Sequence, residues 1–224
     1  MNAISKMTEA AHQKLWQRFT PAQRVARFGV YLAIVAAIVA SLGTLLALVL
    51  ALPVGLLAAH NLCPWTPVNL LAKLVLVSSR SVNSLVWALL FVGIFGPGAL
   101  AGTLAIAFRS IGFVGKLFGE ALEETSRGPI EALDAAGAPA LSRLSFGYWP
   151  QVKPAFWSIA LFRWDINVRE SAVLGLVGAG GVGMTLDAAL NLFQWDRVAL
   201  ILLAIFAIVI LAEIAVTFVR RKML

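Results

Sequence analysis

A single apolar run constrains this chain more than any other feature. From Phe28 to about Ala59, 32 residues follow one another without a charged side chain. As one α-helix, rising about 1.5 Å per residue, the run would be about 48 Å long. Because the hydrocarbon core of a bilayer is about 30 Å thick, the run is too long for one span unless it is strongly tilted, and short for two.

The composition places the whole chain in a membrane. Hydrophobic residues make up 60% of the 224 residues, charged residues only 13%, and the mean hydropathy is +0.88. Charged residues alone are about a quarter of a soluble domain. The sequence therefore predicts an all-α integral membrane protein, with room for about six spans of about 20 residues each.

Several function classes do not suit this composition. The net charge of +7 comes from basic residues in the short flanks of apolar segments, which is typical of membrane topology and not of a nucleic-acid surface. Cys63, His12 and His60 are too few for a disulfide framework or a usual metal site. A membrane-embedded enzyme would need a titratable cluster at one depth, and only Asp165 and Glu170 come close, among arginines. We therefore expect no enzyme activity and no metal site in this chain.

The distribution of Lys and Arg predicts the orientation. The arm at 1–27, the polar insert at about 119–150 and the tail at 220–224 all carry basic residues, so the positive-inside rule places all three, and both termini, in the cytoplasm. The "GPG" turn at 96–98 has no charge, and the connection at about 175–195 has no Lys or Arg. Both are expected on the outer side.

The number of membrane crossings then constrains the first apolar run. The blocks 74–95 and 99–118 give two crossings between that run and the insert, so the run must cross an even number of times if the arm and the insert share a side. We infer a hairpin that turns near "SLGT" at 41–44, which gives six spans within a transmembrane domain at 28–219. A re-entrant or surface-lying first segment is the alternative.

The polar insert has the signals of two short helices. In "GPIEALDAAG", Pro129 suits the first turn of a helix, where its missing N–H costs nothing, and Glu131 and Asp134 lie near the positive end of that helix. Gly137 can end the helix in a left-handed conformation, and Pro139 can begin a second one. The insert is therefore expected to form a compact cytoplasmic knob.

Small side chains on this knob suit a docking role. Ala132, Ala135 and Ala136 would fit a partner's groove, although an ordinary amphipathic cytoplasmic loop is the alternative. The segment "EALDAAGAPALSRLSFGYWP" resembles the "EAA" loop with which permeases of ABC importers dock into their ATPase, with Leu133 at the third position of the signature. The resemblance implies ATPase coupling by Glu131, Ala132, Asp134, Ala136 and Gly137.

Further segments extend the resemblance from about residue 43 to residue 219. "GTLLALVLALPVGLLAAHNL", "LVWALLFVGIFGPGALAGTLAIAF", "SIGFVGKLFGEALEE", "RGPIEALDAAGA" and "VLGLVGAGGVG" together resemble, in this order, the permease of the phosphonate ABC importer family. The resemblance implies the type I ABC importer permease fold with a coupling helix in the cytoplasmic loop. Members of that family usually have a longer extracytoplasmic segment after the first helix, whereas here "VASL" runs directly into "GTLL".

The resemblance also implies a function and a set of partners. The chain would be the translocation subunit of an ATP-driven importer for phosphonate or a related phosphorus oxyanion, such as phosphite or phosphate, in the bacterial inner membrane. Its partners would be a second permease copy, expected to be identical, two ATPase subunits that bind ATP and Mg, and an extracytoplasmic substrate-binding protein. No cofactor is expected in this chain. A permease for another small solute, such as an amino acid, and a non-transporting membrane scaffold are the alternatives.

Charges inside the fifth predicted span are candidates for the substrate pathway. "FRWDINVRES" places Arg163, Asp165, Asn167 and Arg169 late in an apolar span, where each charge costs on the order of 3 kcal/mol at mid-bilayer. Asp165 and Arg169 are an i,i+4 pair, and Arg163 and Asn167 share an adjacent face. A guanidinium can bind two oxygens of a tetrahedral oxyanion, although structural ion pairs are the alternative. The pathway candidates are Arg163, Asn167, Arg169, Arg80 and Asn83, with Arg109 as a further one.

A glycine-rich hexapeptide has a misleading pattern. "GAGGVG" at 178–183 matches the dinucleotide fingerprint G-x-G-x-x-G, but that fingerprint has meaning only between a strand and a helix of a βαβ unit. Between membrane spans on the outer side, a flexible or closely packed gate is the better hypothesis, because glycines let backbones approach one another. The gate candidates are Gly178, Gly180, Gly181 and Gly183.

Overall fold

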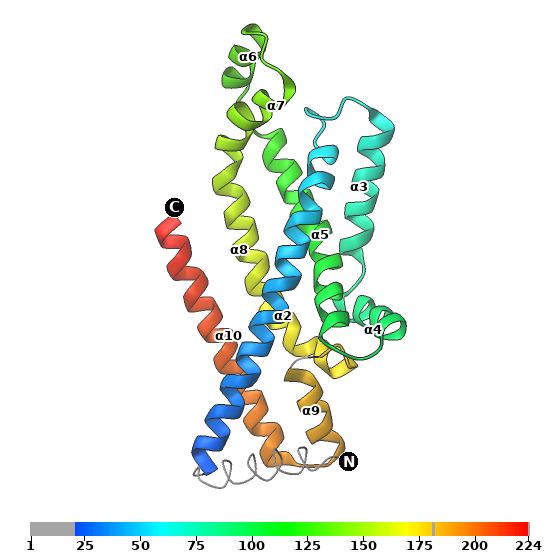
Figure 1. Ribbon diagram of the computed structural model, residues 1–224, viewed down its shortest axis with the longest axis vertical. Coiled ribbons are helices and arrows are strands. Elements are labelled where there is room, and N and C mark those ends of the chain that lie inside the picture. Colours follow the sequence, from blue (N-terminus) through cyan, green and yellow to red (C-terminus); the bar gives the residue numbers. More distant parts are fainter. Residues whose placement is uncertain (1–20, 181, 224) are drawn as a thin grey trace, which may run out of the picture.

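The computed structural model describes residues 21–180 and 182–223, and all regular structure in this part of the chain is helical (Figure 1). The α-helices are α2 (Pro21–Ala58), α3 (Thr66–Ser81), α4 (Ser84–Phe95), α5 (Ala99–Glu123), α6 (Gly128–Ala135), α7 (Ala140–Ser142), α8 (Trp149–Leu174), α9 (Val182–Asn191) and α10 (Trp195–Met223). A π-helical turn, η1 (Arg143–Tyr148), precedes α8, and a 3₁₀ turn, η2 (Gly175–Val177), follows it. The all-α class that the sequence predicts is confirmed.

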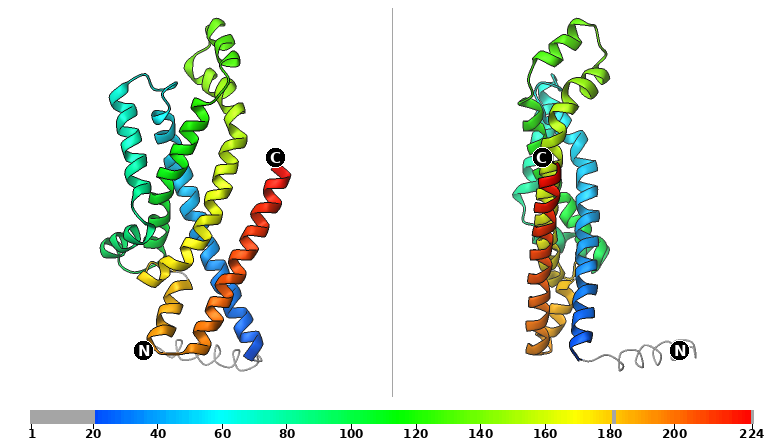
Figure 2. Two further views of the ribbon diagram at one scale, coloured as in Figure 1. Left: turned by 180° about the vertical axis from the view of Figure 1, so that it is seen from behind. Right: turned by 90° about the vertical axis from the view of Figure 1, so that its left-hand side faces the viewer.

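Helix α5 is the central element of the bundle. It packs against α2, α3, α4 and α8, and 56% of its most apolar stretch is buried, compared with 17% for α10 at the edge (Figure 2). Small residues allow this packing, since a Cβ atom on Gly55 of α2 would lie 3.0 Å from Gly115 O of α5. Close approach of helix backbones is a major source of attraction between helices in a membrane.

The predicted hairpin at 41–44 is wrong, because α2 continues through these residues as one helix. The segment is a close helix contact instead of a turn: a Cβ atom on Gly43 would lie 2.8 Å from Ile106 Cγ2 of α5. The Thr44 hydroxyl donates to Ala40 O at 2.6 Å, which satisfies it within the helix. Small and weakly polar residues that suggest a turn in water can thus join two helices in a membrane.

The continuous helix also bears on the predicted position of the arm at 1–27. Because α2 is one helix, its first turn lies at the opposite end of the molecule from α6, as Figures 1 and 2 show. Residues 1–20 lie outside the described part of the chain. The positive-inside rule predicts the arm at 1–27 and the insert on the same side of the membrane, and the hairpin was inferred from that placement because it requires an even number of crossings. The single helix α2 does not support the shared side, and the cytoplasmic position of the arm stays a prediction.

The predicted span at 74–95 is two helices, α3 and α4, bent by 92°. Helix α4 begins after Asn83, whose side-chain oxygen accepts a hydrogen bond from Leu85 N at 3.1 Å. Asn is among the residues that best cap a helix N-terminus. By length and hydropathy, three of the described helices, α2, α5 and α10, can each cross a membrane, and the bent pair can be a fourth span.

Helix α8 is long enough to cross a bilayer but carries several charges. Its 26 residues include Lys153, Arg163, Asp165, Arg169 and Glu170. Neighbouring helices α2, α5 and α10 pack against it. A charge is costly in lipid, so packing against protein allows this helix to lie within the bundle. In place of six separate apolar spans, the described residues form three or four apolar spans and this charged helix.

Candidate functional site

Helix α6 ends in a Schellman motif. Gly137 has a φ of +71°, its N–H donates to Asp134 O at 3.0 Å, and Ala138 N donates to Leu133 O at 3.0 Å. Glycine adopts this left-handed conformation without the strain that a Cβ atom would add. The predicted end of the helix at Gly137 is confirmed, and Pro139 lies directly before α7, where the second helix was predicted to begin.

The knob is defined here as residues 128–148. Within it, α6 packs closely against η1. A Cβ atom on Gly147 would lie 3.3 Å from Leu133 Cδ1 and 3.4 Å from Ile130 Cγ1, so the glycine lets α6 approach closely. Arg143 Nη1 also donates to Asp134 Oδ1 at 2.7 Å. Because η1 continues directly into α8, the knob is joined to a helix that runs back into the bundle (Figure 2).

The outer surface of the knob is exposed. Helix α6 has no buried residue, and the five predicted coupling residues are all exposed: Glu131, Ala132, Asp134, Ala136 and Gly137. Leu141 and Phe146, which the sequence analysis missed, are 74% and 71% exposed. Large apolar side chains exposed on a polar segment are available for contact with a protein partner. Their occurrence inside a polar insert is the signal that would have revealed them.

A buried polar cluster lies where α8 passes α5. Arg163 is 3% exposed, its Nε donates to Ser110 Oγ at 2.8 Å, and its Nη2 donates to Glu170 Oε2 at 3.3 Å. Arg109 of α5 forms an ion pair with the other carboxylate oxygen of Glu170. One carboxylate thus holds two arginines from two helices. Charges removed from water need such partners.

Asn167 extends this cluster to α2. Its Nδ2 donates to Thr44 Oγ1 at 2.8 Å, and its Oδ1 lies 3.2 Å from Ser110 Oγ. Ser110 therefore contacts both Asn167 and Arg163, which confirms that these two residues share one face of α8. The side chains of three helices, α2, α5 and α8, meet in this network.

Two further pathway candidates have local partners. Arg169 forms the predicted i,i+4 ion pair with Asp165, and its side chain is 48% exposed. Asn83 caps α4 at the bend between α3 and α4. Their role in a substrate pathway stays a prediction.

A cavity of about 380 Å³ opens beside the buried cluster. Its lining comes from three helices: Arg80 and Ser81 of α3, Arg109 and Phe113 of α5, and Arg163 of α8. The Arg163 guanidinium carbon lies 5.6 Å from the centre of the Phe113 ring, within the range of a cation–π contact. Arg80 is exposed and forms no ion pair with any residue that the structure describes. The structure thus brings three of the candidate arginines together.

The glycine-rich connection packs closely against the "GPG" turn. Gly178 and Gly180 both have a φ of +79°, and Gly98 N donates to Gly178 O at 2.9 Å. A Cβ atom on Gly180 would lie 2.5 Å from Ala99 N, so only glycine fits there. Gly183 lies at the start of α9, where a Cβ atom on Gly175 would be 2.5 Å from it. Gly181 lies outside the described residues, and the role of this contact as a gate stays a prediction.

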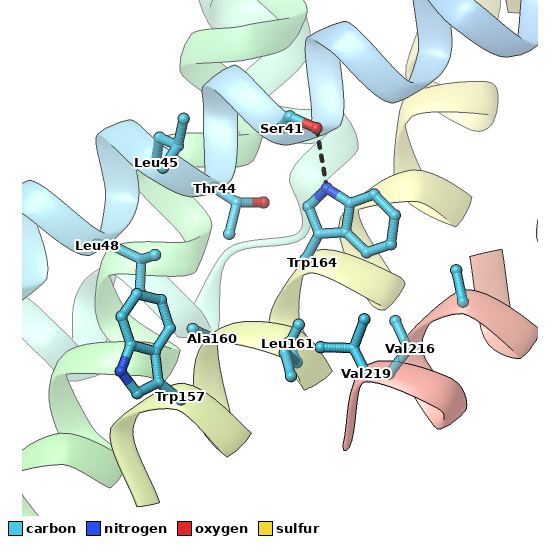
Figure 3. Close-up of a pocket in the computed structure, with 11 residues that line it drawn as sticks. Ser41, Thr44, Leu45, Leu48, Trp157, Ala160, Leu161, Trp164, Val216 and Val219 are labelled. Atoms are coloured by element: carbon cyan, nitrogen blue, oxygen red, sulfur yellow. Dashed lines mark hydrogen bonds between the residues drawn. The ribbon is translucent and has the colours of Figure 1, made fainter. Parts of the chain in front are cut away.

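An apolar hollow lies on another side of α8, between α2 and α10 (Figure 3). Its volume is also about 380 Å³, and its lining includes Trp157, Leu161 and Trp164. The indole Nε1 of Trp164 donates to Ser41 Oγ at 3.0 Å, which satisfies that N–H. This lining presents no charged group, so the arginine cavity is the better candidate for an anion.

Apolar helices long enough to cross a membrane, a buried charged network and an exposed helical knob are together the features of an integral membrane protein with several spans. The chain belongs to the family described as the binding-protein-dependent transport system inner membrane component, which matches residues 51–224. It is 44% identical over 165 residues to the phosphite transport system permease protein PtxC of Stutzerimonas stutzeri, across 74% of this chain and 60% of that protein.

Two other relatives also have names from phosphorus metabolism. The chain is 39% identical over 168 residues to the phosphate-import permease protein PhnE of Mycolicibacterium smegmatis, across 75% of this chain and 32% of that protein. It is 38% identical over 110 residues to the putative cryptic phosphonate transport system permease protein PhnE2 of Escherichia coli, across 49% of this chain and 90% of that protein. The resemblance to phosphonate-type importer permeases is confirmed. The chain spans about 60% of the length of PtxC and about a third of that of PhnE.

Solved structures share the fold. The inward-facing MetNI methionine ABC transporter matches with a TM-score of 0.75 and 20% identity, across 92% of this chain and 100% of that chain. An amino acid ABC transporter with histidines matches with a TM-score of 0.73 and 17% identity, across 90% and 96%. The type I importer permease fold is therefore confirmed, and these matches carry no information on the solute.

Proposed function

We propose that this chain is the translocation subunit of an ATP-driven importer for a phosphorus oxyanion: phosphonate, phosphite or phosphate. The exposed knob on a charged membrane helix carries the proposal, because a surface joined rigidly to a buried polar network can transmit the motion of a partner. The names of the relatives support the solute class, since they include phosphite and phosphate permeases.

The knob connects an ATPase partner to the arginines. ATP and Mg bind to that partner, and this chain has no catalytic role. A force on α6 passes to η1 through the Asp134–Arg143 ion pair and the packing of Gly147, and from η1 directly to α8. Because Arg163 lies on α8 and Arg109 on α5, a shift of α8 changes the width of the arginine cavity. Alternating access follows from such shear between packed helices.

The remaining partners complete the path. An extracytoplasmic binding protein delivers the anion, and a second copy of this chain encloses the path. Large apolar side chains on α3, α4 and α10, such as Leu71, Ile94 and Leu203, are exposed in a single chain and suit contact with lipid or with that second copy. The knob lies in the cytoplasm, and the packed glycines at 178–180 act as the outer gate in the inner membrane.

A pair of glycine substitutions, one in the knob and one in α4, tests the proposal. Gly137 and Gly93 are both exposed, and no atom of the described residues lies within 4 Å of an added Cβ at either, but only Gly137 has a positive φ. Valine at Gly137 is therefore strained, whereas valine at Gly93, inside a helix, is not. We expect Gly137→Val to reduce uptake of radiolabelled phosphite and stimulation of the ATPase, while Gly93→Val retains both at equal amounts of membrane protein.

Three results would count against the proposal. Equal uptake by the two variants would exclude the knob as the coupling surface. Uptake of an amino acid in place of phosphite, phosphate and phosphonate would favour the alternative permease class. Purification of the chain without an ATPase would favour a membrane scaffold.

A further inference from the structure

We propose that Arg80, Arg109 and Arg163 form a binding site for one tetrahedral oxyanion with two negative charges, and that Glu170 is the counter-charge the anion displaces from these arginines. This inference rests on the proposed function and deepens it. The site is the cavity of about 380 Å³ between α3, α5 and α8.

The charges around this cavity do not balance. Among the residues that the structure describes, three arginines and one carboxylate, Glu170, give this region a net charge of +2. The neighbouring ion pair of Asp165 and Arg169 is neutral by itself. An excess of positive charge is costly inside an apolar bundle, so a bound dianion would neutralise the site.

The arginines also have free hydrogen-bonding capacity. Glu170 accepts from Arg109 Nη1 and from Arg163 Nη2, and Ser110 accepts from Arg163 Nε. Arg109 Nη1 also donates to Ser84 Oγ at 3.3 Å. The other N–H groups of these two guanidiniums, and all those of Arg80, donate to no protein group in the described part of the chain. Guanidinium groups bind oxyanions through paired N–H donors, and three of them from three helices surround a small anion better than one.

The broken span adds to the same site. Arg80 lies at the last turn of α3, two residues before the bend, and α4 begins beside Arg109, because Arg109 Nη1 donates to Ser84 Oγ at 3.3 Å. The positive end of the α4 dipole therefore lies near the arginines. Transporters commonly place anion sites at such helix breaks.

Glu170 makes the site reversible. An anion in the cavity competes with the carboxylate for the same two arginines, so part of the gain on binding is lost with the Glu170 contacts. A transport site must bind its ligand strongly enough to accept it and weakly enough to release it. A built-in competing carboxylate meets both requirements.

The test is direct binding to the full chain in lipid nanodiscs, with radiolabelled phosphite as the probe and no ATPase present. Arg80→Gln is the test variant, since Arg80 is exposed and free of ion pairs with described residues, so that the fold should tolerate the change. Lys73→Gln removes one positive charge from the same helix outside the cavity and serves as the matched control. Arg80→Lys shows whether a positive charge at this position, without the paired N–H donors of a guanidinium, is enough for phosphite binding.

We expect Arg80→Gln to weaken phosphite binding at least about tenfold, because charge-assisted hydrogen bonds are lost, whereas Lys73→Gln should bind like the wild type. At mildly alkaline pH, phosphite, a dianion, should displace the label better than hypophosphite, a monoanion. Equal binding by Arg80→Gln and the wild type, or no phosphite binding by the wild type, would overturn the site.

Uptake separates this inference from the proposed function. Wild-type cells that take up phosphite, with loss of uptake in Gly137→Val, would uphold the importer even if nanodisc binding shows no role for Arg80. Binding that depends on Arg80, without uptake by the assembled transporter, would uphold the site and reject the importer.

Discussion

Gly112 of α5 lies directly against the backbone of α3. A Cβ atom at this position would overlap Leu76 O and lie 2.8 Å from Arg80 N. Because these are backbone atoms of a helix, they can give way only if α3 moves as a whole. We predict that Gly112→Ala separates α3 from α5 and lowers the free energy of unfolding by about 1–3 kcal/mol, the usual cost of an overpacked contact.

Gly93 provides the matched control for this substitution. It lies in the interior of α4, is exposed, and no atom of the described part of the chain lies within 4 Å of an added Cβ. Alanine is favoured over glycine inside a helix by about 0.5–1 kcal/mol, so Gly93→Ala should stabilise the protein slightly. The same chemical change should therefore have opposite signs at the two positions.

Thermal unfolding of the purified chain in one detergent measures both effects. For a chain of this size, each kcal/mol shifts the Tm by about 2–4 °C, so Gly112→Ala should unfold several degrees below the wild type. Because Arg80 is at the same contact, this variant should also bind phosphite more weakly. A Tm for Gly112→Ala equal to that of Gly93→Ala would refute the argument that the two helix backbones touch there.

Three more substitutions test other parts of the molecule. Glu170→Gln should lower the Tm by leaving two arginines without their carboxylate, and phosphite should raise the Tm of this variant more than that of the wild type; equal increases would contradict the role of Glu170 as a counter-charge. Asp134→Asn weakens a half-exposed ion pair with Arg143, so the Tm should change little while coupled ATPase activity falls, and unchanged coupling would show that the pair does not transmit motion. Trp164→Phe loses one hydrogen bond beside the apolar hollow and should cost about 1 kcal/mol with phosphite binding unchanged, as a binding and unfolding comparison would show.

Local signals in the sequence predicted local structure well. The end of α6 at Gly137 follows from glycine's access to a positive φ, and the ion pair of Asp165 and Arg169 follows from helical spacing alone. Such features depend on four or five consecutive residues, so neighbours in space cannot easily change them. The membrane environment is equally secure, because composition sums over the whole chain.

Features that depend on neighbouring helices were not predictable in the same way. The sequence at 41–44 has the composition of a turn, but Gly43 packs on Ile106 of α5 and the helix continues. The bend at Asn83 was likewise not predicted, because the apolar block around it was interpreted as one interrupted span. In both cases small and polar residues are compatible with a turn and with a continuous or closely packed helix. The neighbouring helix decides which of the two forms.

Composition and local sequence patterns were enough to predict the membrane class, the helical knob and the residues that carry charge into the apolar region. Which of these charges meet depends on the tertiary structure: Arg80, Arg109 and Arg163 are far apart in the chain and line one cavity because α3 and α8 each pack against α5. Van der Waals packing and hydrogen bonds between helices decide which helices touch in a membrane, and they depend on every helix at once, so a single segment cannot reveal the partner of its own arginine.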